Sequence, residues 1–245
     1  MIAFVKKLMP AGLRRLARRI VNERFDGYAF KSYSQEGEDM MLRRLFENQP
    51  AGFYVDVGAH HPFRFSNTCY FYKRGWSGIN IDAMPGSMSA FKRFRPRDIN
   101  LEIPVSNTRE VLTFYVFNEP ALNGFSKELS LERQQGKQGF FIREELKLQT
   151  FKLSEILDRH LPAGQAIDFL SIDAEGHDFE VLKSNDWGKC KPKAVLVEIY
   201  GGSLQDIGSH EIAVYLRQQG YLIFAKSLYT VIFVCKDIHA ALFNH

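Results

Sequence analysis

The chain contains short apolar runs that end abruptly in polar residues, a pattern typical of strands buried in a parallel sheet. Five such runs cover residues 53–57, 78–82, 99–105, 167–173 and 193–199. Segments with apolar residues at helical spacing predict helices over 40–46, 68–74, 89–94, 154–160 and 211–219. Two last runs, 221–225 and 229–235, predict an antiparallel hairpin. The pattern as a whole predicts a doubly wound, mostly parallel α/β sheet that ends in this hairpin.

The middle of the chain departs from this alternation. Residues 111–117 alternate in polarity and predict an exposed antiparallel strand, and residues 141–153 predict an edge strand. Between them, residues 122–139 are rich in Gly, Gln, Ser and Lys. We expect this stretch to form a long polar loop, mobile and close to the functional site.

The first thirty residues differ from the rest in composition. Apolar residues recur there at helical spacing with basic residues between them, which predicts a basic amphipathic helical segment over 1–30, followed by one domain over 31–245. Seven Lys or Arg and one Glu give residues 1–24 a charge of +6, which leaves −2 for the remainder of a chain whose net charge is +4. The domain therefore lacks the basic surface expected of a nucleic-acid-binding protein.

The basic segment has two interpretations. It either contacts an anionic membrane surface, or it is a solvated helix or a subunit contact. No apolar run approaches the roughly 20 residues that span a bilayer. The three cysteines lie far apart and form no metal-ligand spacing, which favours a reducing compartment. We expect a cytoplasmic protein, peripheral at the inner face of the membrane under the first interpretation.

The first predicted strand ends in a tight turn with the features of a nucleotide-binding crevice. Gly58 and Ala59 would let a ligand approach the backbone N–H groups. Asp56 suits an ammonium group or ribose hydroxyls, whereas a phosphate would be repelled. The alternative is a structural turn in which Asp56 closes its own loop.

The second predicted strand also ends in an acid, Asp82, a little over twenty residues beyond the glycine turn. A doubly wound nucleotide-binding sheet places the carboxylate that binds ribose hydroxyls at this separation. The alternative is that Asp82 caps the helix that begins near Ser87. The third strand leads into Ser106, and the turn there would lie over the base of a bound nucleoside.

The fourth predicted strand leads into a turn that carries Asp173, Glu175 and His177. A carboxylate and an imidazole within one turn provide a general base near neutral pH, or two hard metal ligands. A purely structural turn is the alternative. Glu198 is also unusual, because a carboxylate inside an apolar strand requires a partner or a function.

A resemblance to a known family rests on several motifs in order. They are Tyr33-Ser-Gln-x-Gly-Glu-Asp39, Tyr54-Val-Asp-Val-Gly-Ala-His60, Ser66-Asn-Thr68, Asn80-Ile-Asp82, Ser171-Ile-Asp-Ala-Glu-Gly-His-Asp178 and Pro192-Lys-Ala-Val-Leu-Val-Glu198. Together they resemble the FkbM-type methyltransferases from residue 33 to residue 235. The resemblance implies a class I, Rossmann-like S-adenosylmethionine-dependent O-methyltransferase with a seven-stranded sheet. Such enzymes act on hydroxyls of sugars, lipid-linked glycans and secondary metabolites.

The resemblance also implies roles for single residues. Asp56 and Gly58, with Ala59 beside them, would hold the methionine part of the cofactor. Asp82 would bind the ribose and Ser106 would flank the adenine. Asp173 and Glu175 would line the methyl-transfer site. The chain departs from many class I enzymes after Gly58, where His60, His61 and Pro62 replace further glycines.

The chemistry of the implied reaction requires few protein groups. Methyl transfer from a sulfonium needs positioning of the two reactants and a base for the hydroxyl proton. We expect His177 or Glu175 to be that base and Asp173 to orient substrate and cofactor, while His60 and His61 stay open as candidates. A divalent cation such as Mg²⁺ would be an alternative activator of the hydroxyl.

Two rival functions follow from the same residues. The chain could be a non-catalytic nucleotide- or partner-binding module on the same fold, but such a module has no need of Asp173, Glu175 and His177 together. An RNA methyltransferase is disfavoured by the charge of −2 outside the basic segment. A hydroxyl-bearing metabolite or glycan is therefore the expected acceptor.

Overall fold

The computed structural model describes residues 10–25 and 27–243, and the chain divides into two compact units between Ser32 and Tyr33. In the first unit, α2 (Ala11–Arg24) lies within the predicted basic segment. The part of that segment before residue 10 lies outside the described residues. Among the described helices, none is long and apolar enough to cross a bilayer.

The second unit is built on a seven-stranded sheet with the strand order β3-β2-β1-β6-β7-β9-β8. Its strands are β1 (Phe53–Val57), β2 (Ser77–Asp82), β3 (Ile99–Glu102), β6 (Phe169–Ile172), β7 (Ala194–Glu198), β8 (Tyr221–Lys226) and β9 (Thr230–Cys235). All neighbours are parallel except β9, which is antiparallel to both β7 and β8. The predicted doubly wound sheet with a terminal antiparallel hairpin is confirmed.

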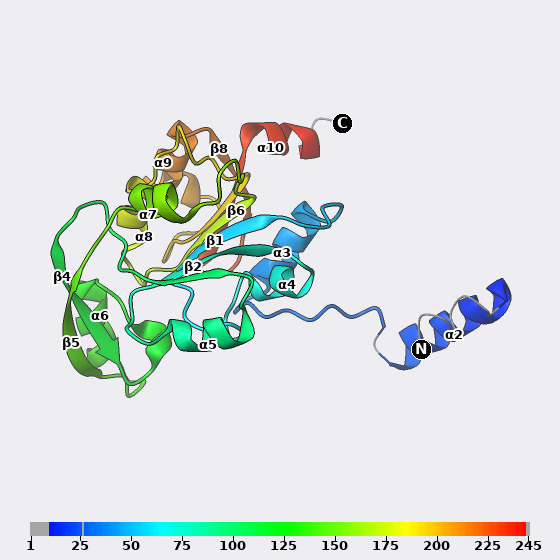
Figure 1. The fold of residues 1–245 in the computed structure, drawn as a ribbon, viewed down its shortest axis with the longest axis horizontal. Helices are drawn as coiled ribbons and strands as arrows, with labels where there is room; N and C mark the ends of the chain where they lie inside the picture. Colours follow the sequence, from blue (N-terminus) through cyan, green and yellow to red (C-terminus); the bar gives the residue numbers. More distant parts are fainter. Residues whose placement is uncertain (1–9, 26, 244–245) are drawn as a thin grey trace. The chain divides into compact units, whose positions relative to one another are not determined.

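Helices cover both faces of this sheet (Figure 1). On one face, α7 (Leu153–His160), α8 (Asp178–Lys183) and α9 (Glu211–Gln218) pack on the larger apolar cluster. On the other, α3 (Glu38–Leu45) and α4 (Cys69–Lys73) pack on a cluster rich in aromatic rings. The central strand β1 is buried along its whole length, which explains its continuous apolar run. Two further helices are α5 (Met88–Phe94) and α10 (Lys236–Phe243).

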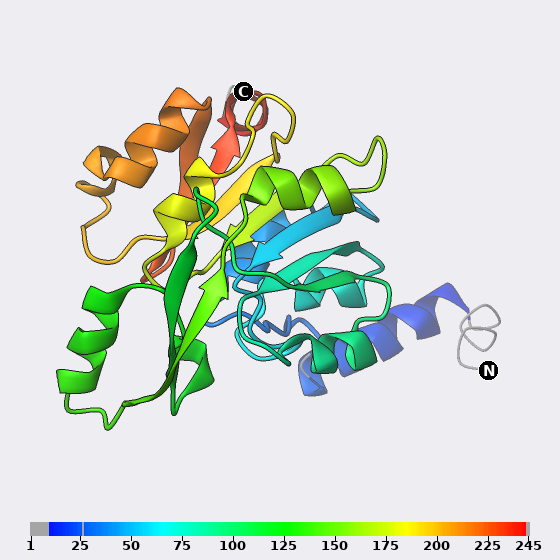
Figure 2. The same cartoon turned by 60° about the vertical axis from the view of Figure 1, so that its left-hand side comes forward.

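A second, two-stranded antiparallel sheet interrupts the alternation after β3. It consists of β4 (Val111–Phe117) and β5 (Ile142–Gln149), and it stands beside the main sheet together with α6 (Lys127–Gln135) (Figure 2). The predicted long loop over 122–139 is therefore wrong, because half of it is α6. Ser126 begins this helix, and its Oγ accepts a hydrogen bond from the Leu129 amide at 3.3 Å. A 3₁₀ turn, η1 (Pro120–Leu122), precedes it.

Several predicted boundaries also change. The third strand ends at Glu102 and not at Val105, whose only pairing among the described strands is an isolated bridge to Phe151. The strand predicted over 141–153 is shorter and pairs with β4 alone. The expectation of an exposed strand over 111–117 fails in its second half, because the side chains of 114–117 are buried. The helix α10 has no counterpart in the sequence prediction, and a second 3₁₀ turn, η2 (Ile207–Ser209), precedes α9.

Candidate active site

A cavity of about 800 Å³ opens at the carboxyl ends of the parallel strands. Its floor and sides come from the segments that follow β1, β2, β6 and β7, and its outer wall comes from β4, β5 and the segment between them. The volume lies within the range of sites that bind small molecules and cofactors. Parallel α/β sheets bind their ligands at this edge.

The turn after β1 requires glycine. Gly58 has a φ of +82°, and a Cβ atom there would lie 1.7 Å from the carbonyl oxygen of Asp173. The Gly58 amide donates to the carbonyl oxygen of Ile81 at 2.9 Å, which fixes the turn against β2. Gly58 lines the cavity, but the Ala59 amide also donates to the Ile81 carbonyl oxygen, at 3.1 Å. The expectation that the N–H groups of Gly58 and Ala59 face a ligand is therefore wrong, because both bind β2.

Asp82 lies in the cavity wall at the end of β2. Its carboxylate accepts hydrogen bonds from the amides of His60 at 2.9 Å and Met84 at 2.8 Å. Each oxygen retains a lone pair for a ligand hydroxyl. Burial raises the pKa of Asp82, while the two amides oppose that rise. The cavity wall beside Asp82 is mainly apolar. Its apolar residues directly follow β2 or β3 in the chain: Ala83, Met84, Ile103 and Val105.

Asp56 does not line the cavity. Its side chain is buried in β1, where Thr68 Oγ1 donates to its carboxylate at 2.9 Å. The fully buried Arg95 donates in turn to Thr68 Oγ1 at 2.9 Å. This position favours a structural role for Asp56 over contact with a cofactor.

Three other predicted site residues also lie outside the cavity lining. Ala59 is buried and packs with Met88 and Phe91. Ser106 is buried, and its hydroxyl lies 3.0 Å from Nε2 of His177. That contact turns the imidazole of His177 toward the segment that follows β3. Burial lowers the pKa of His177, which keeps the ring neutral at pH 7.

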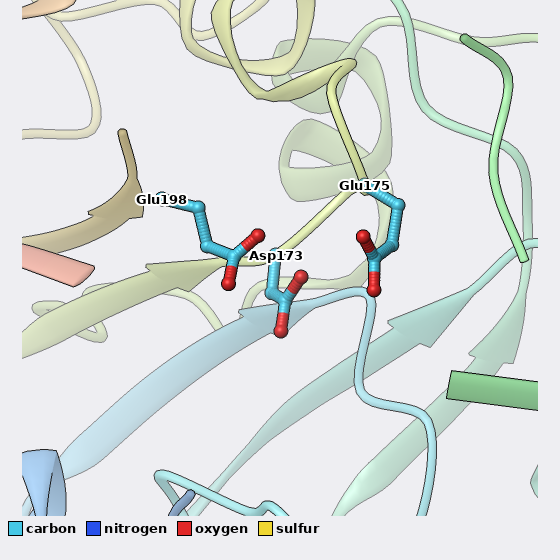
Figure 3. A group of neighbouring side chains, drawn as sticks. All are labelled: Asp173, Glu175 and Glu198. Atoms are coloured by element: carbon cyan, nitrogen blue, oxygen red, sulfur yellow. The ribbon is translucent and has the colours of Figure 1, made fainter. Parts of the chain in front are cut away.

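The turn after β6 brings two predicted catalytic residues into the cavity, and β7 adds a third acid. Asp173, Glu175 and Glu198 place carboxylate oxygens within 4.8 Å of one another, and all three line the cavity. We refer to them as the carboxylate cluster. In Figure 3 the side chain of Asp173 lies between those of Glu175 and Glu198. Glu175 adopts a φ of +52°, unusual for a residue with a side chain.

The acids of the carboxylate cluster are close together and partly buried, so the charged form of each is disfavoured. Burial, together with the charges of Glu198 and Glu175, raises the pKa of Asp173 well above its ordinary value. Burial and the nearby acids also raise the pKa of Glu198, to about 8. Oδ1 of Asp173 is buried and has no hydrogen-bond partner among the described residues. The cluster therefore retains a proton near neutral pH and presents an unused acceptor atom.

Two residues that the sequence analysis did not identify hold Glu175 in place. Arg133 of α6 forms an ion pair and a hydrogen bond with Oε2 of Glu175. The hydroxyl of Tyr200 lies 3.0 Å from the same oxygen and also contacts Glu198, so the two acids share its single proton. Tyr200 follows β7 by two residues, so its position at the sheet edge was available from the sequence. Arg133 gave no comparable signal.

His60 and His61, left open by the sequence, both line the cavity. Burial and the charge of Arg64 lower the pKa of each. Nε2 of His60 is buried without a hydrogen-bond partner in the part of the chain that the structure describes. Gln35, from the segment before α3, also reaches the cavity. Glu36 instead accepts hydrogen bonds from the amides of Leu228 and Tyr229 in the β8–β9 turn.

The site lies within a stretch that matches a known protein family. Residues 56–223 match the family described as methyltransferase FkbM domain, and the match includes Gly58, Asp82 and the carboxylate cluster. No curated protein matches the sequence significantly. Among solved structures, the fold is similar to a TehB-like S-adenosylmethionine-dependent methyltransferase from Corynebacterium glutamicum, with 13% sequence identity and a TM-score of 0.37. That comparison covers 93% of this chain and 100% of the other.

Proposed function

Because the chain belongs to the FkbM methyltransferase family, we propose that it transfers the methyl group of S-adenosylmethionine to a hydroxyl oxygen of a sugar, glycan or secondary metabolite. Family membership supports both methyl transfer and S-adenosylmethionine as the methyl donor. The hydroxyl acceptor is our inference, and one observation supports it: the carboxylate cluster, with a proton near neutral pH and an unpartnered oxygen on Asp173, lies inside the cavity.

The residues of the cavity suit S-adenosylmethionine. The cofactor supplies an electrophilic methyl group on a sulfonium, and it also carries an ammonium group and a ribose. Asp82 offers acceptor lone pairs for ribose hydroxyls, and Gly58 lines the cavity without a side chain that would fill it. The carboxylate cluster attracts positive charge, because three acids face a single paired arginine, Arg133.

The proton of the acceptor hydroxyl requires a destination. A sugar hydroxyl is a weak acid, so a base must accept its proton as the oxygen–methyl bond forms and the sulfur–methyl bond breaks. Asp173 is the best placed of the three acids, since its Oδ1 is unpartnered and its raised pKa brings it closer to that of the hydroxyl. We assign the proton to Asp173, with Glu198 sharing the charge.

This assignment revises the expected roles of the other two residues. Glu175 is held by Arg133 and Tyr200 and orients the turn. His177 donates to or accepts from Ser106 and does not line the cavity. Its position favours a structural role at the start of α8.

A divalent cation is the alternative use of the carboxylate cluster, since hard cations such as Mg²⁺ prefer carboxylate oxygens. Asp173 and Glu198 suit this role, but Glu175 Oε2 is already occupied by Arg133 and Tyr200. We therefore expect turnover to persist after dialysis against a chelator. Turnover that is lost on chelation and restored by Mg²⁺ would assign the cluster to a cation.

The acceptor class can be tested by turnover. The full chain, labelled S-adenosylmethionine and a panel of paired acceptors should be used, each pair having a hydroxyl in one member and an amine at the same position in the other. We expect methylation of the hydroxyl member and a loss of its rate in Asp173→Asn. Methylation of amines alone contradicts the proposal. Cofactor binding without turnover on any acceptor supports the binding-module alternative.

A further inference from the structure

The helix α2 separates apolar from basic residues around its axis. Its apolar residues occupy positions i, i+3, i+4, i+7 and i+8, which share one face of a helix: Leu13, Leu16, Ala17, Ile20 and Val21. The four large ones are 47–57% exposed. Such a stripe of exposed large apolar side chains is unfavourable in water.

The opposite side of α2 is strongly basic. Residues 11–24 contain five arginines and one glutamate, so the helix carries a charge of +4, although Arg24 lies at its C-terminal end in line with the apolar face. Arg15 and Arg19 lie opposite the apolar face by helical position, and Arg14 lies at its border. Arg19 pairs with Glu23 at 2.6 Å, and this exposed ion pair contributes little to stability.

We propose that α2 binds the surface of an anionic lipid bilayer, with its apolar face in the boundary between headgroups and acyl chains and its arginines on lipid phosphates. A high helical amphipathicity, a basic polar face and a length too short to span the bilayer are the features of helices that lie in this plane. This interaction surface is separate from the methyl-transfer site, and it does not depend on the function proposed for that site.

A second copy of α2 is a poorer occupant of the apolar face. Pairing two helices of charge +4 would bring ten arginines and two glutamates together, and the repulsion would oppose association. An anionic bilayer supplies both an apolar phase and the opposite charge. Charge complementarity therefore selects the lipid surface.

The test is co-sedimentation of the full-length protein with vesicles. We expect binding to vesicles that contain about 30% phosphatidylglycerol, weaker binding as salt rises, and no binding to pure phosphatidylcholine. Arg14→Gln, Arg15→Gln and Arg19→Gln together should lower the partition coefficient on the order of 100-fold, since each basic residue contributes about fivefold near an anionic surface. Glutamine preserves helix propensity.

Matched variants separate the helix from the rest of the chain. Leu16→Gln with Ile20→Gln should lower binding on the order of tenfold, because the apolar face no longer inserts. Leu204→Gln with Val214→Gln changes two exposed apolar residues of the other unit and should leave binding unchanged. A second control replaces the exposed Lys92, Lys127 and Lys191 by Gln. Thermal unfolding checks that every variant is folded.

Three results would overturn the proposal. One is an absence of binding to the phosphatidylglycerol vesicles, and another is equal binding to charged and neutral vesicles. The third is equal loss of binding in the helix variants and their controls. If sedimentation equilibrium without lipid instead shows a dimer that the Leu16 and Ile20 substitutions dissociate, the apolar face belongs to a second copy of the chain.

Discussion

Gly58 and Asp173 meet backbone to backbone, so closely that a Cβ atom on Gly58 would lie 1.7 Å from the Asp173 carbonyl oxygen. The first residue belongs to the turn after β1 that lines the cavity, and the second belongs to the carboxylate cluster. The contact fixes the distance between the two halves of the site, because neither backbone can move away without leaving the sheet edge.

The contact predicts a large effect of a single methyl group. Gly58→Ala should lower the free energy of unfolding by more than about 4 kcal/mol or displace the turn, since backbone atoms cannot yield as a flexible side chain does. Gly86 is the matched control: its φ is +84°, but its Cβ would meet nothing within 4 Å. Gly86→Ala should cost only the left-handed strain of about 1–2 kcal/mol. Urea denaturation measures both, and equal losses would contradict the clash.

The carboxylate of Asp82 predicts a loss of cofactor affinity. Asp82→Asn places an amide N–H₂ where the carboxylate accepts from His60 and Met84, so one accepting oxygen is lost. We expect S-adenosylmethionine to bind more weakly by about 1–3 kcal/mol in calorimetry. Glu102→Gln is the control, because Glu102 accepts from the Met88 amide but does not line the cavity. Unchanged affinity in a folded Asp82→Asn protein would refute this placement of the ribose.

The carboxylate cluster and His177 should differ in their kinetics. Asp173→Asn should lower kcat by roughly 10²–10⁴, the range for the loss of a general base. His177→Ala should keep kcat within about threefold and lower the free energy of unfolding by about 1 kcal/mol, because it loses only its contact with Ser106. Steady-state kinetics and denaturation distinguish the two. A large fall of kcat in His177→Ala would instead identify His177 as the general base.

The raised pKa of Glu198 predicts how stability depends on pH. With a folded-state pKa of about 8 against an ordinary 4.5, Glu198 keeps a proton that the unfolded chain has lost. The folded state thus binds more protons in this window, and the free energy of unfolding falls as pH rises through it. The contribution is complete below pH 4.5 and lost above pH 8.

Melting temperatures from pH 5 to pH 9 measure this effect. In Glu198→Gln the melting temperature should fall less steeply as pH rises. A smaller fall should remain, because burial raises the pKa of Asp178 to about 7. Glu145→Gln, an exposed substitution on β5, should retain the wild-type slope. The turnover rate should instead increase as pH rises, because Asp173 must lose its proton to act as a base. A melting temperature that rises through this window would contradict the assignment.

The sequence predicted the sheet well because its strands are continuous apolar runs. Their ends placed Gly58, Asp82, Asp173 and Glu175 at one edge, where the structure has them. Asp56 shows what was missed. Side chains alternate along a strand, so Asp56 points away from the face that Val55 and Val57 share, toward Thr68.

Two further features depend on tertiary contacts that no local pattern records. The helix α6 has no clear apolar stripe, so its nine residues resemble a polar loop in sequence, and Arg133 could not be assigned to the site. The direction of His177 depends on the left-handed conformations of Glu175 and Gly176. Sequence spacing alone puts His177 in the turn but does not say which way it faces.

The outer wall of the cavity comes from one continuous stretch of chain. Residues 111–149 contribute β4, α6 and β5, and the chain leaves and rejoins the main fold at adjacent points, since Val105 bridges to Phe151 and the Thr150 amide donates to the Glu110 carbonyl oxygen at 2.9 Å. Such a stretch can be exchanged as one unit without altering the strands that carry Gly58 and Asp82. We therefore expect a chimera that carries another family member's version of residues 111–149 to keep its affinity for S-adenosylmethionine while adopting the acceptor preference of that relative.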